Sequence, residues 1–466
     1  TALLAPSGEL VVTQVENLPW DQHAVLGFAM QDQWNSITTI PVNIDSTSTV
    51  SMAAPLPPPT LSSPSLASLR DVTWHVDVHW GPGQAVRRRG IESLELFAER
   101  PAMMPTWTRS SREGITYQAQ RFDFISAGTR LENTLARVAL RDLSLEAWIQ
   151  AKCKQHDHEA RPSDAGRRAT LLAKMLGSRQ AYTELFGGPL LPALRAMLPN
   201  SATTNTAYPD HQGIVLSARE GVLTFTGLGA RCLKLSSEEL RGRVDAACRT
   251  GVLRRGLVLR CATCEDKQFL QIDKLGQRWT CQRCDALNDL DQWSWKAPHD
   301  EPTWFYDLHP VGRQILRDNG DVPALLSSHL QRRPRSPSKR QPFSDVAEVV
   351  FAKSGQAVVE LDLITYVNDK ITVAECKTSG RDLEGKPGRR EVTKKCQAAA
   401  WLRADELLFA TTAHSWTPAS QSAIKAAVEA FSSWSPLGPP AVTLVSQLGT
   451  DHEKSDALPV VARSHS

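Results

Sequence analysis

Acidic and basic side chains stand inside two apolar runs in the C-terminal quarter of the sequence. Glu360 and Asp362 lie in VVELDLITYV, and Glu375 and Lys377 lie in ITVAECK. Residues two apart on a β-strand share a face, so pairing these runs brings Asp362, Glu375 and Lys377 together. Two carboxylates and a backbone carbonyl are oxygen ligands suited to Mg²⁺, and a nearby ammonium can orient water or steady charge on a phosphate. The pattern predicts a metal-dependent site for phosphate chemistry.

The surrounding sequence predicts an antiparallel meander that positions these side chains. VAEVVFA, VVELDLITYV and ITVAECK are the expected strands, with turns at Ser354-Gly355 and Asn368-Asp369. The second and third runs are nearly continuously apolar, which is typical of strands covered on both faces. The alternative is a polar face in water, but charges embedded between apolar residues are costly unless they pair or bind a metal.

These residues resemble the PD-(D/E)XK, or restriction-endonuclease-like, nuclease superfamily. Glu-Leu-Asp is followed thirteen residues later by Glu-Cys-Lys, then by a basic segment and a predicted helix. The resemblance spans residues 340–450 and implies Asp362 and Glu375 as Mg²⁺ ligands and Lys377 as the catalytic lysine. Within the helix, Gln397-Ala-Ala-Ala-Trp401 is similar to the Gln-x-x-x-Tyr element of the branch related to recombination nucleases, which implies a catalytic role for Gln397.

The segment before Asp362 departs from the family pattern. The family usually places a helix with an acidic residue, and then a strand, before the metal-binding aspartate, whereas only SDVAEVVFAKSGQ precedes the Glu-Leu-Asp strand here. If 346–352 is a strand, the first helix lies further back, within 309–330, and Glu348 is not the helix acid. The sequence leaves open whether Glu348 or Glu360 is a ligand.

Four of the nine cysteines form two C-x-x-C pairs. Cys261-Ala-Thr-Cys264 and Cys281-Gln-Arg-Cys284 are separated by sixteen residues. Each pair can present two thiolates from one tight turn, and two turns complete a tetrahedral Zn²⁺ site. The pattern looks like a zinc ribbon, with QFLQI and QRWT expected to form a hairpin between the knuckles. Four thiolates leave no open position for water, so the zinc is expected to be structural.

Two segments are locally basic. SGRDLEGKPGRREVTKK, after the third strand, is interpreted as a basic loop that suits a polyanionic substrate. QRRPRSPSKRQ (331–341) is a connector, either solvated or an arm that contacts phosphates.

Composition limits the classes of protein. The 466 residues contain 53 Lys and Arg against 50 Asp and Glu, a net charge of +3, so a nucleic-acid surface must be a local patch. No apolar run reaches the 18–20 residues of a transmembrane helix, and no membrane association is expected. An odd number of cysteines with this clustering favours a reducing, cytoplasmic compartment. The opening TALLAPSGEL lacks an initiator Met and a secretory signal, which indicates a trimmed or partial N-terminus.

The expected architecture is an α+β multidomain protein. It comprises a β-rich region (1–130) with a Pro/Ser/Thr-rich linker at 41–68 and strands near 71–80, 91–98 and 115–126, a mainly helical region (131–254), the zinc ribbon (255–295), a connector (296–340), a nuclease-like α/β domain with a central mixed sheet (341–450) and a tail (451–466). A capping box at Ser236–Glu239 starts a helix before the strand 255–261, and one interpretation of this pair is the end of a winged helix.

The sequence as a whole predicts a metal-dependent nuclease with catalytic Mg²⁺ and structural Zn²⁺. The expected partner is nucleic acid, with DNA as the preferred substrate, and other protein subunits. Fold-level analogy connects such a chain to prokaryotic defence or to another multi-subunit complex. The alternative is a non-catalytic nucleic-acid-binding or assembly subunit that uses the nuclease fold as a scaffold.

Overall fold

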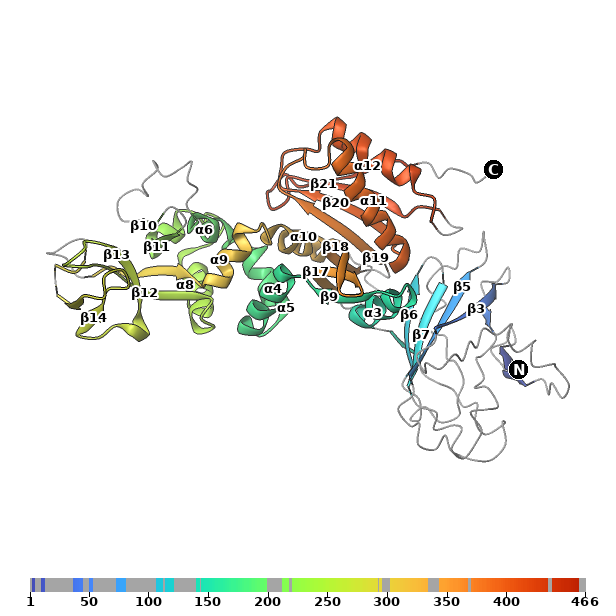
Figure 1. The fold of residues 1–466 in the computed structure, drawn as a ribbon, viewed down its shortest axis with the longest axis horizontal. Coiled ribbons are helices and arrows are strands. Elements are labelled where there is room, and N and C mark those ends of the chain that lie inside the picture. Colours follow the sequence, from blue (N-terminus) through green and yellow to red (C-terminus); the bar gives the residue numbers. More distant parts are fainter. Residues whose placement is uncertain are drawn as a thin grey trace, which may run out of the picture.

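The structure is a computed structural model (Figure 1). It describes residues 144–198, 212–217, 220–291, 293–295, 302–333, 343–367, 370–434 and 438–460, and the backbone of eight strands within the first 142 residues. The helices are α3 (Leu145–Gln155), α4 (Asp164–Leu176), α5 (Arg179–Phe186), α6 (Leu191–Ala196), α7 (Phe225–Gly229), α8 (Ser237–Arg249), α9 (Pro310–Arg317), α10 (Asp321–Arg332), α11 (Gly385–Leu402) and α12 (Pro418–Ala430).

The largest sheet has seven strands and carries the residues singled out above. Its order is β22-β21-β20-β19-β18-β17-β9, with β20 parallel to both of its neighbours and the other pairs antiparallel. The strands are β9 (Glu159–Pro162), β17 (Ser344–Lys353), β18 (Gln356–Val367), β19 (Lys370–Lys377), β20 (Glu406–Thr411), β21 (Ala441–Ser446) and β22 (Lys454–Ala457). The described part of the chain is therefore α+β with a mixed sheet, as predicted.

The predicted meander is confirmed as β17, β18 and β19. Ser354 and Gly355 join the first two strands and have φ values of 49° and 79°. Two consecutive left-handed residues fit a tight hairpin whose twist matches that of the strands. Because 344–353 is a strand, Glu348 is not a helix acid.

Helices cover both faces of this sheet (Figure 1). α11 and α12 link the parallel strands and pack together with α3 on one face, over a core that includes Trp148, Phe351 and Phe409. On the other face α10 packs against β18 and β19. Strands buried on both sides are what the apolar runs predicted.

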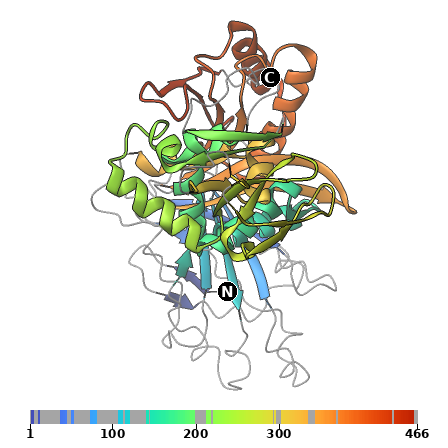
Figure 2. The ribbon, with the colours of Figure 1, turned by 90° about the vertical axis from the view of Figure 1, so that its left-hand side faces the viewer.

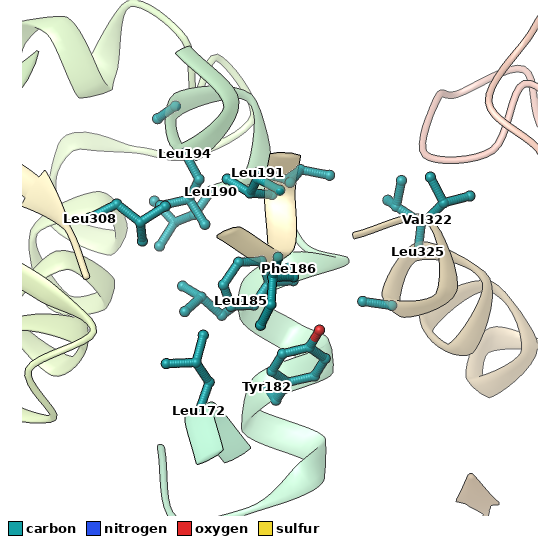
Figure 3. Packing of buried hydrophobic residues seen from close by; sticks show 14 of the residues in the cluster. Leu172, Tyr182, Leu185, Phe186, Leu190, Leu191, Leu194, Leu308, Val322 and Leu325 are labelled. Carbon is teal, nitrogen blue, oxygen red and sulfur yellow. The ribbon is translucent and has the colours of Figure 1, made fainter. Parts of the chain in front are cut away.

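The core under α10 continues into the middle of the chain. Side chains from α4, α5, α6, α8, α9 and α10 belong to one cluster with sheet residues such as Leu363 and Val445. Figure 3 shows Phe186 and Leu185 in the middle of this packing, with Leu308 to one side and Leu325 to the other. Parts of the segments predicted as a helical region (131–254) and a connector (296–340) thus share one core with the seven-stranded sheet.

A second sheet leads into the cysteine hairpins. Its order is β10-β11-β16-β12-β13, all antiparallel. Its strands are β10 (Gly213–Ser217), β11 (Glu220–Thr224), β12 (Leu253–Arg260), β13 (Lys267–Gln271) and β16 (Phe305–Leu308), and a separate pair consists of β14 (Arg278–Thr280) and β15 (Leu287–Asp289). The short 3-10 helix η6 (Ile272–Lys274) follows β13.

The prediction of one hairpin between the cysteine knuckles is wrong. QFLQI pairs with β12 and QRWT pairs with β15, so each C-x-x-C stands at the turn of its own hairpin. The reason is local: Cys261 N–H bonds to Asp266 and Cys281 N–H bonds to Ala286, each across its knuckle at 2.9 Å. The knuckle itself closes the hairpin.

The predicted basic loop after β19 is also wrong, because α11 already begins at Gly385. Glycines in a sequence usually indicate a loop, but Gly388 lies within α11, where the lack of a side chain allows close packing against the Leu383 backbone. A Cβ at this position would lie 2.1 Å from the backbone carbonyl carbon of Leu383. Lys386, Arg389 and Arg390 are therefore exposed side chains on a helix.

The seven-stranded sheet extends beyond the predicted boundary of 341–450. β9 comes from the predicted helical region, and β22 lies within the predicted tail 451–466. All four residues of β22 are exposed, so this edge strand has no apolar pattern that sequence analysis could detect. The part of the connector from 334 to 340 lies outside the described residues.

The first 142 residues are described only at strands β1 (Ala2–Leu4), β2 (Leu10–Val12), β3 (Ile37–Ile44), β4 (Val50–Met52), β5 (Thr73–Trp80), β6 (Thr106–Ser111), β7 (Gly114–Gln120) and β8 (Leu140–Asp142). The last six form a sheet of order β4-β3-β5-β7-β6-β8. The strand predicted at 91–98 lies outside the described residues. The expected linker 41–68 contributes to β3 and β4, and ITTIPVNI in β3 is rich in β-branched residues that favour strands.

Within the described residues, no helix combines the length and the apolar composition needed to cross a membrane.

Candidate metal and phosphate site

The candidate site lies where β18 and β19 separate. The two strands pair from Val367 and Lys370 as far as Leu363 and Ala374, and no further. Beyond the pair of Leu363 and Ala374, the Cys376 N–H donates to Asp362 Oδ2, at 2.6 Å. The Asp362 carboxylate thus replaces a backbone acceptor at the fork between the strands.

Glu375 is the buried centre of the site. Its side chain is 1% exposed, and Lys377 Nζ lies 2.5 Å from its Oε1. Its other oxygen, Oε2, lies 2.7 Å from Lys395 Nζ. The structure therefore brings Asp362, Glu375 and Lys377 together, as the spacing predicted, and adds a second lysine.

Lys395 was not identified as a site residue from the sequence. It comes from α11, its side chain is 2% exposed, and its ammonium also reaches Glu391 Oε1 at 3.1 Å and the Glu360 carbonyl oxygen. A signal for it exists, because Lys395 lies within the apolar stripe formed by Val392, Cys396 and Ala399 on the sheet-facing side of α11. A lysine at such a position needs a buried partner.

Glu348 adds a third carboxylate near the fork. Register places it opposite Asp362, but its φ of 56° interrupts the β17–β18 ladder between Ala347 and Val349. The Glu348 carbonyl accepts from Ser163 N–H, at 2.8 Å. Gly166 makes this approach feasible, since a Cβ there would lie 2.4 Å from the same carbonyl oxygen. Glu360, by contrast, has an exposed side chain.

Burial and mutual repulsion destabilise the charged forms of these acids. Burial raises the pKa of Asp362 to about 7, and the charge of Glu375 contributes to the same rise. Burial also raises the pKa of Glu348 to about 8, with added repulsion from Asp362, Glu360 and Glu375. Burial disfavours the charged form of Lys377, but Glu375 and Asp362 outweigh it and raise the pKa of that ammonium.

A divalent cation between these acids would counter the shifts. If all three were ionised, Asp362, Glu348 and Glu375 would carry one more charge than Lys377 and Lys395 neutralise, so a further positive charge would stabilise the ionised forms. The donors are carboxylate oxygens at a point where the ladder opens and the Cys376 backbone is adjacent, which is the ligand chemistry of Mg²⁺.

Gln397 is not brought to the fork. It is half-buried on α11, two positions after Lys395, and therefore about 200° around the helix from the ammonium that contacts Glu375. It shares a helix face with Trp401, whose ring lies 4.4 Å from that of His158 and 5.4 Å from that of His156, between ring centroids. This face packs against the end of α3.

The four paired cysteines form a compact cluster. Their sulfur atoms lie within 4.8 Å of one another, with 3.7 Å between Cys261 and Cys284 and 3.6 Å between Cys264 and Cys281. A tetrahedral ion with bonds of about 2.3 Å requires sulfur separations of about 3.8 Å. The Cys264 and Thr263 amides stabilise the Cys261 thiolate and lower its pKa to about 6. The arrangement fits Zn²⁺.

The two knuckles are also internally symmetric. Gln268 Oε1 accepts from the Gln282 N–H at 3.0 Å, and Asn288 Oδ1 accepts from the Ala262 N–H at 2.8 Å. Each amide side chain belongs to the hairpin of one knuckle and caps the other knuckle. This exchange fixes the two hairpins relative to each other.

Comparisons with known proteins give no family assignment. No protein-family model and no curated protein matches the chain. Among solved structures, the chain is similar to protein VC1899 from Vibrio cholerae, with 13% identity, a TM-score of 0.25, and coverage of 64% of this chain and 57% of that one. It is also similar to Can2 from Sulfobacillus thermosulfidooxidans, solved in complex with cyclic tetra-adenylate, with 12% identity, a TM-score of 0.23, and coverage of 66% and 59%. The chain thus spans less than two thirds of either protein, and TM-scores this low assign no shared fold.

Proposed function

We propose that this chain is a metal-dependent nuclease of the PD-(D/E)XK type that hydrolyses phosphodiester bonds, with DNA as its substrate. The observation that carries the proposal is the convergence of Asp362, Glu375 and Lys377 at a strand fork, where burial and repulsion between the acids raise the pKa of Asp362. A purely structural site of this kind would be expected to balance its buried charges.

Asp362 and Glu375 would hold the Mg²⁺, with Glu348 and the Cys376 carbonyl as further oxygen donors. The ion would supply a Lewis acid for the phosphate and lower the pKa of a bound water. Lys395 keeps Glu375 Oε2 fixed, so that Oε1 is the oxygen available for the cation.

Lys377 is the lysine suited to meet the substrate. Its side chain is 28% exposed, whereas that of Lys395 is 2% exposed. A cation held by Glu375 would compete with Lys377 for this carboxylate and would leave the ammonium free for the substrate. Lys377 would then orient the attacking water and stabilise negative charge on the phosphate.

One feature of the described residues supports a nucleic-acid substrate. Lys386, Arg389 and Arg390 are exposed on the first turns of α11, which starts shortly after Lys377 and also carries Lys395. Phosphate contacts from such side chains give sequence-independent affinity. The four-cysteine cluster would hold structural Zn²⁺ and stabilise the hairpins β12–β13 and β14–β15.

The test is cleavage of supercoiled plasmid and single-stranded DNA in Mg²⁺ or Mn²⁺, with wild type, Lys377→Ala and Lys353→Ala. Lys353 is an exposed lysine at the far end of β17 and serves as the matched control. We expect nicking by wild type and Lys353→Ala, and loss of at least about 100-fold in rate for Lys377→Ala. Equal cleavage by Lys377→Ala would place the active site elsewhere, and DNA binding without cleavage by any variant would indicate the scaffold role.

A further inference from the structure

The middle of the chain has an arrangement that the proposed nuclease site does not use. α6 is followed by the hairpin β10–β11, then by α7, α8 and β12, and the chain returns through the cysteine hairpins to β16. In the sheet, β16 lies between β11 and β12. Two helices enclosed by a strand on one side and a strand pair on the other are the layout of a winged helix, with α8 as the second helix of a helix-turn-helix.

α8 has one buried face and one open face. Leu240, Val244 and Ala247 are buried in the core. Ser236 and Glu239 form a capping box, which fixes the start of the helix. The exposed residues are Glu238, Glu239, Arg241, Gly242, Arg243, Ala246 and Arg249. Figure 2 shows α8, in yellow-green, along the outside of this end of the molecule.

The open face is basic. Its exposed ionisable side chains are three arginines, Arg241, Arg243 and Arg249, and two acids, Glu238 and Glu239. Glu239 is engaged in the capping box, and four neighbouring cations between residues 231 and 260 already pair with acids: Lys234, Arg254, Arg255 and Arg260. Arg241 lies over the Phe225 ring at 4.6 Å, which holds it at the edge of the face.

Arg243 and Arg249 are the cations that remain available for a ligand. Both are exposed, and the charge of Arg243 also contributes to the lowered pKa of Glu239, one turn earlier on the helix. Gly242 lies earlier on the same helix, and no atom lies within 4 Å of the position that a Cβ would take there. A second surface can therefore approach the α8 backbone closely at this point.

We propose that α8 and the adjoining β12–β13 hairpin bind double-stranded DNA, with α8 in the major groove and the cysteine hairpins in the position of a wing. Charge complementarity favours a polyanion. A helix of about 10–12 Å diameter fits the major groove of B-form DNA, about 12 Å wide. The major groove of A-form RNA is too narrow for side chains to read. The inference deepens the proposed function, because it names duplex DNA as the polymer presented to the nuclease site.

The experiment is fluorescence anisotropy with a labelled 24-base-pair DNA duplex, without added Mg²⁺. The full-length zinc-loaded protein carries Lys377→Ala to prevent cleavage. On this background Arg243→Ala/Arg249→Ala is compared with Lys353→Ala/Lys454→Ala, which removes the same charge at exposed sites far along the chain. Duplex RNA and single-stranded DNA of the same sequence are the other ligands.

We expect the arginine pair to lower duplex DNA affinity at least about tenfold, and the plot of log K against log salt to lose about 2 from its slope, because each phosphate contact contributes about 0.9. The lysine pair should change affinity less than about twofold. Equal losses for both pairs, or an arginine-dependent preference for RNA or single strands, would overturn the inference. So would unchanged DNA binding, which would leave α8 as a surface for protein.

Because the assay needs no cleavage, a protein that binds duplex DNA through α8 but never cuts it would refute only the nuclease.

Discussion

At the residue scale, the site is organised around one buried carboxylate with two different lysines. Lys377 meets Glu375 from the same strand face and is partly exposed, whereas Lys395 meets it from a helix and is buried. Two other acids with raised pKa values lie next to this carboxylate, so a bound cation would favour their ionised forms. The two lysines should therefore respond differently to mutation.

Lys395→Met should destabilise the metal-free protein by about 3 kcal/mol, because it leaves Glu375 buried with half of its compensation. Lys394→Met is the matched control: its side chain is 44% exposed, and its effect should stay within about 0.5 kcal/mol. Chemical denaturation measures both. In Glu375→Gln/Lys395→Met the loss of stability should be smaller than in Lys395→Met, since no buried carboxylate is left undercompensated and Lys377 is partly exposed to solvent. A Lys395→Met protein as stable as Lys394→Met would contradict the pairing.

Asp362 should make the metal-free protein less stable as pH rises. Its folded pKa of about 7 lies above the ordinary aspartate value of 3.8, so the folded state binds the proton more tightly, and stability falls between pH 4 and 7. Glu348 has a folded pKa of about 8, so the stability of the metal-free protein continues to fall up to pH 8. Asp362→Asn should thus be more stable than wild type by about 1–2 kcal/mol at pH 8 without metal, and equal to it at pH 4.

Thermal unfolding at pH 4, 6 and 8, with and without Mg²⁺, measures this difference. Mg²⁺ should raise the Tm of wild type at pH 8 and leave Asp362→Asn unchanged. A wild type whose Tm ignores Mg²⁺ at every pH would show that the carboxylates are not a cation site.

At the element scale, the geometry of the site depends on segments that are distant in sequence. The bulge at Glu348 is held by the start of α4, and the second lysine is supplied by α11. The cysteine hairpins, in contrast, have a core of their own, which is a small cluster around Leu257, Leu270 and Trp279 together with the cysteines.

Gly166→Ala should disturb the Glu348 bulge from a distance. The new Cβ would lie 2.4 Å from the Glu348 carbonyl oxygen, so the strand or the helix must shift, at a cost of about 1–3 kcal/mol. Gly242→Ala is the control: it lies on α8 with nothing within 4 Å of its Cβ, and should stabilise the protein by about 0.5–1 kcal/mol. If both substitutions changed the free energy of unfolding in the same direction, this would argue against a close approach of Gly166 to the Glu348 carbonyl oxygen.

Removal of zinc should unfold only the cysteine hairpins. Cys281→Ser takes away one ligand from a segment that has little core of its own, so protease should cut within residues 261–291 while the seven-stranded sheet stays protected. Limited proteolysis followed by mass spectrometry locates the cuts. Cleavage throughout the chain would mean that the hairpins support the rest of the fold.

Sequence patterns predicted the parts of the site that depend on local geometry. Asp362, Glu375 and Lys377 were placed together because strand residues alternate with period two, and the cysteine cluster because C-x-x-C makes a tight turn. Lys395 was missed, because its position depends on how α11 crosses the sheet, and the role of Glu348 stayed open, because it depends on a left-handed residue stabilised by α4. Tertiary contacts of this kind leave no local pattern.

At the scale of the whole molecule, one core joins the seven-stranded sheet to α8. It runs through α10 and α4–α6, whereas the cysteine hairpins have a small core of their own. Figure 1 shows β12, β13 and β14 at one end and β18 and β19 near the middle. The core that lies under the strand fork therefore also supports α8, where we propose that duplex DNA binds.

The most direct measurement is anomalous diffraction from a crystal of the full chain soaked in Mn²⁺. We predict a peak at the fork, about 2.1 Å from oxygens of Asp362 and Glu375, with Lys377 withdrawn from Glu375 Oε1 and Lys395 still in place on Oε2. A map with no peak there, and with both lysines still on Glu375, would contradict the claim that these residues hold a catalytic cation.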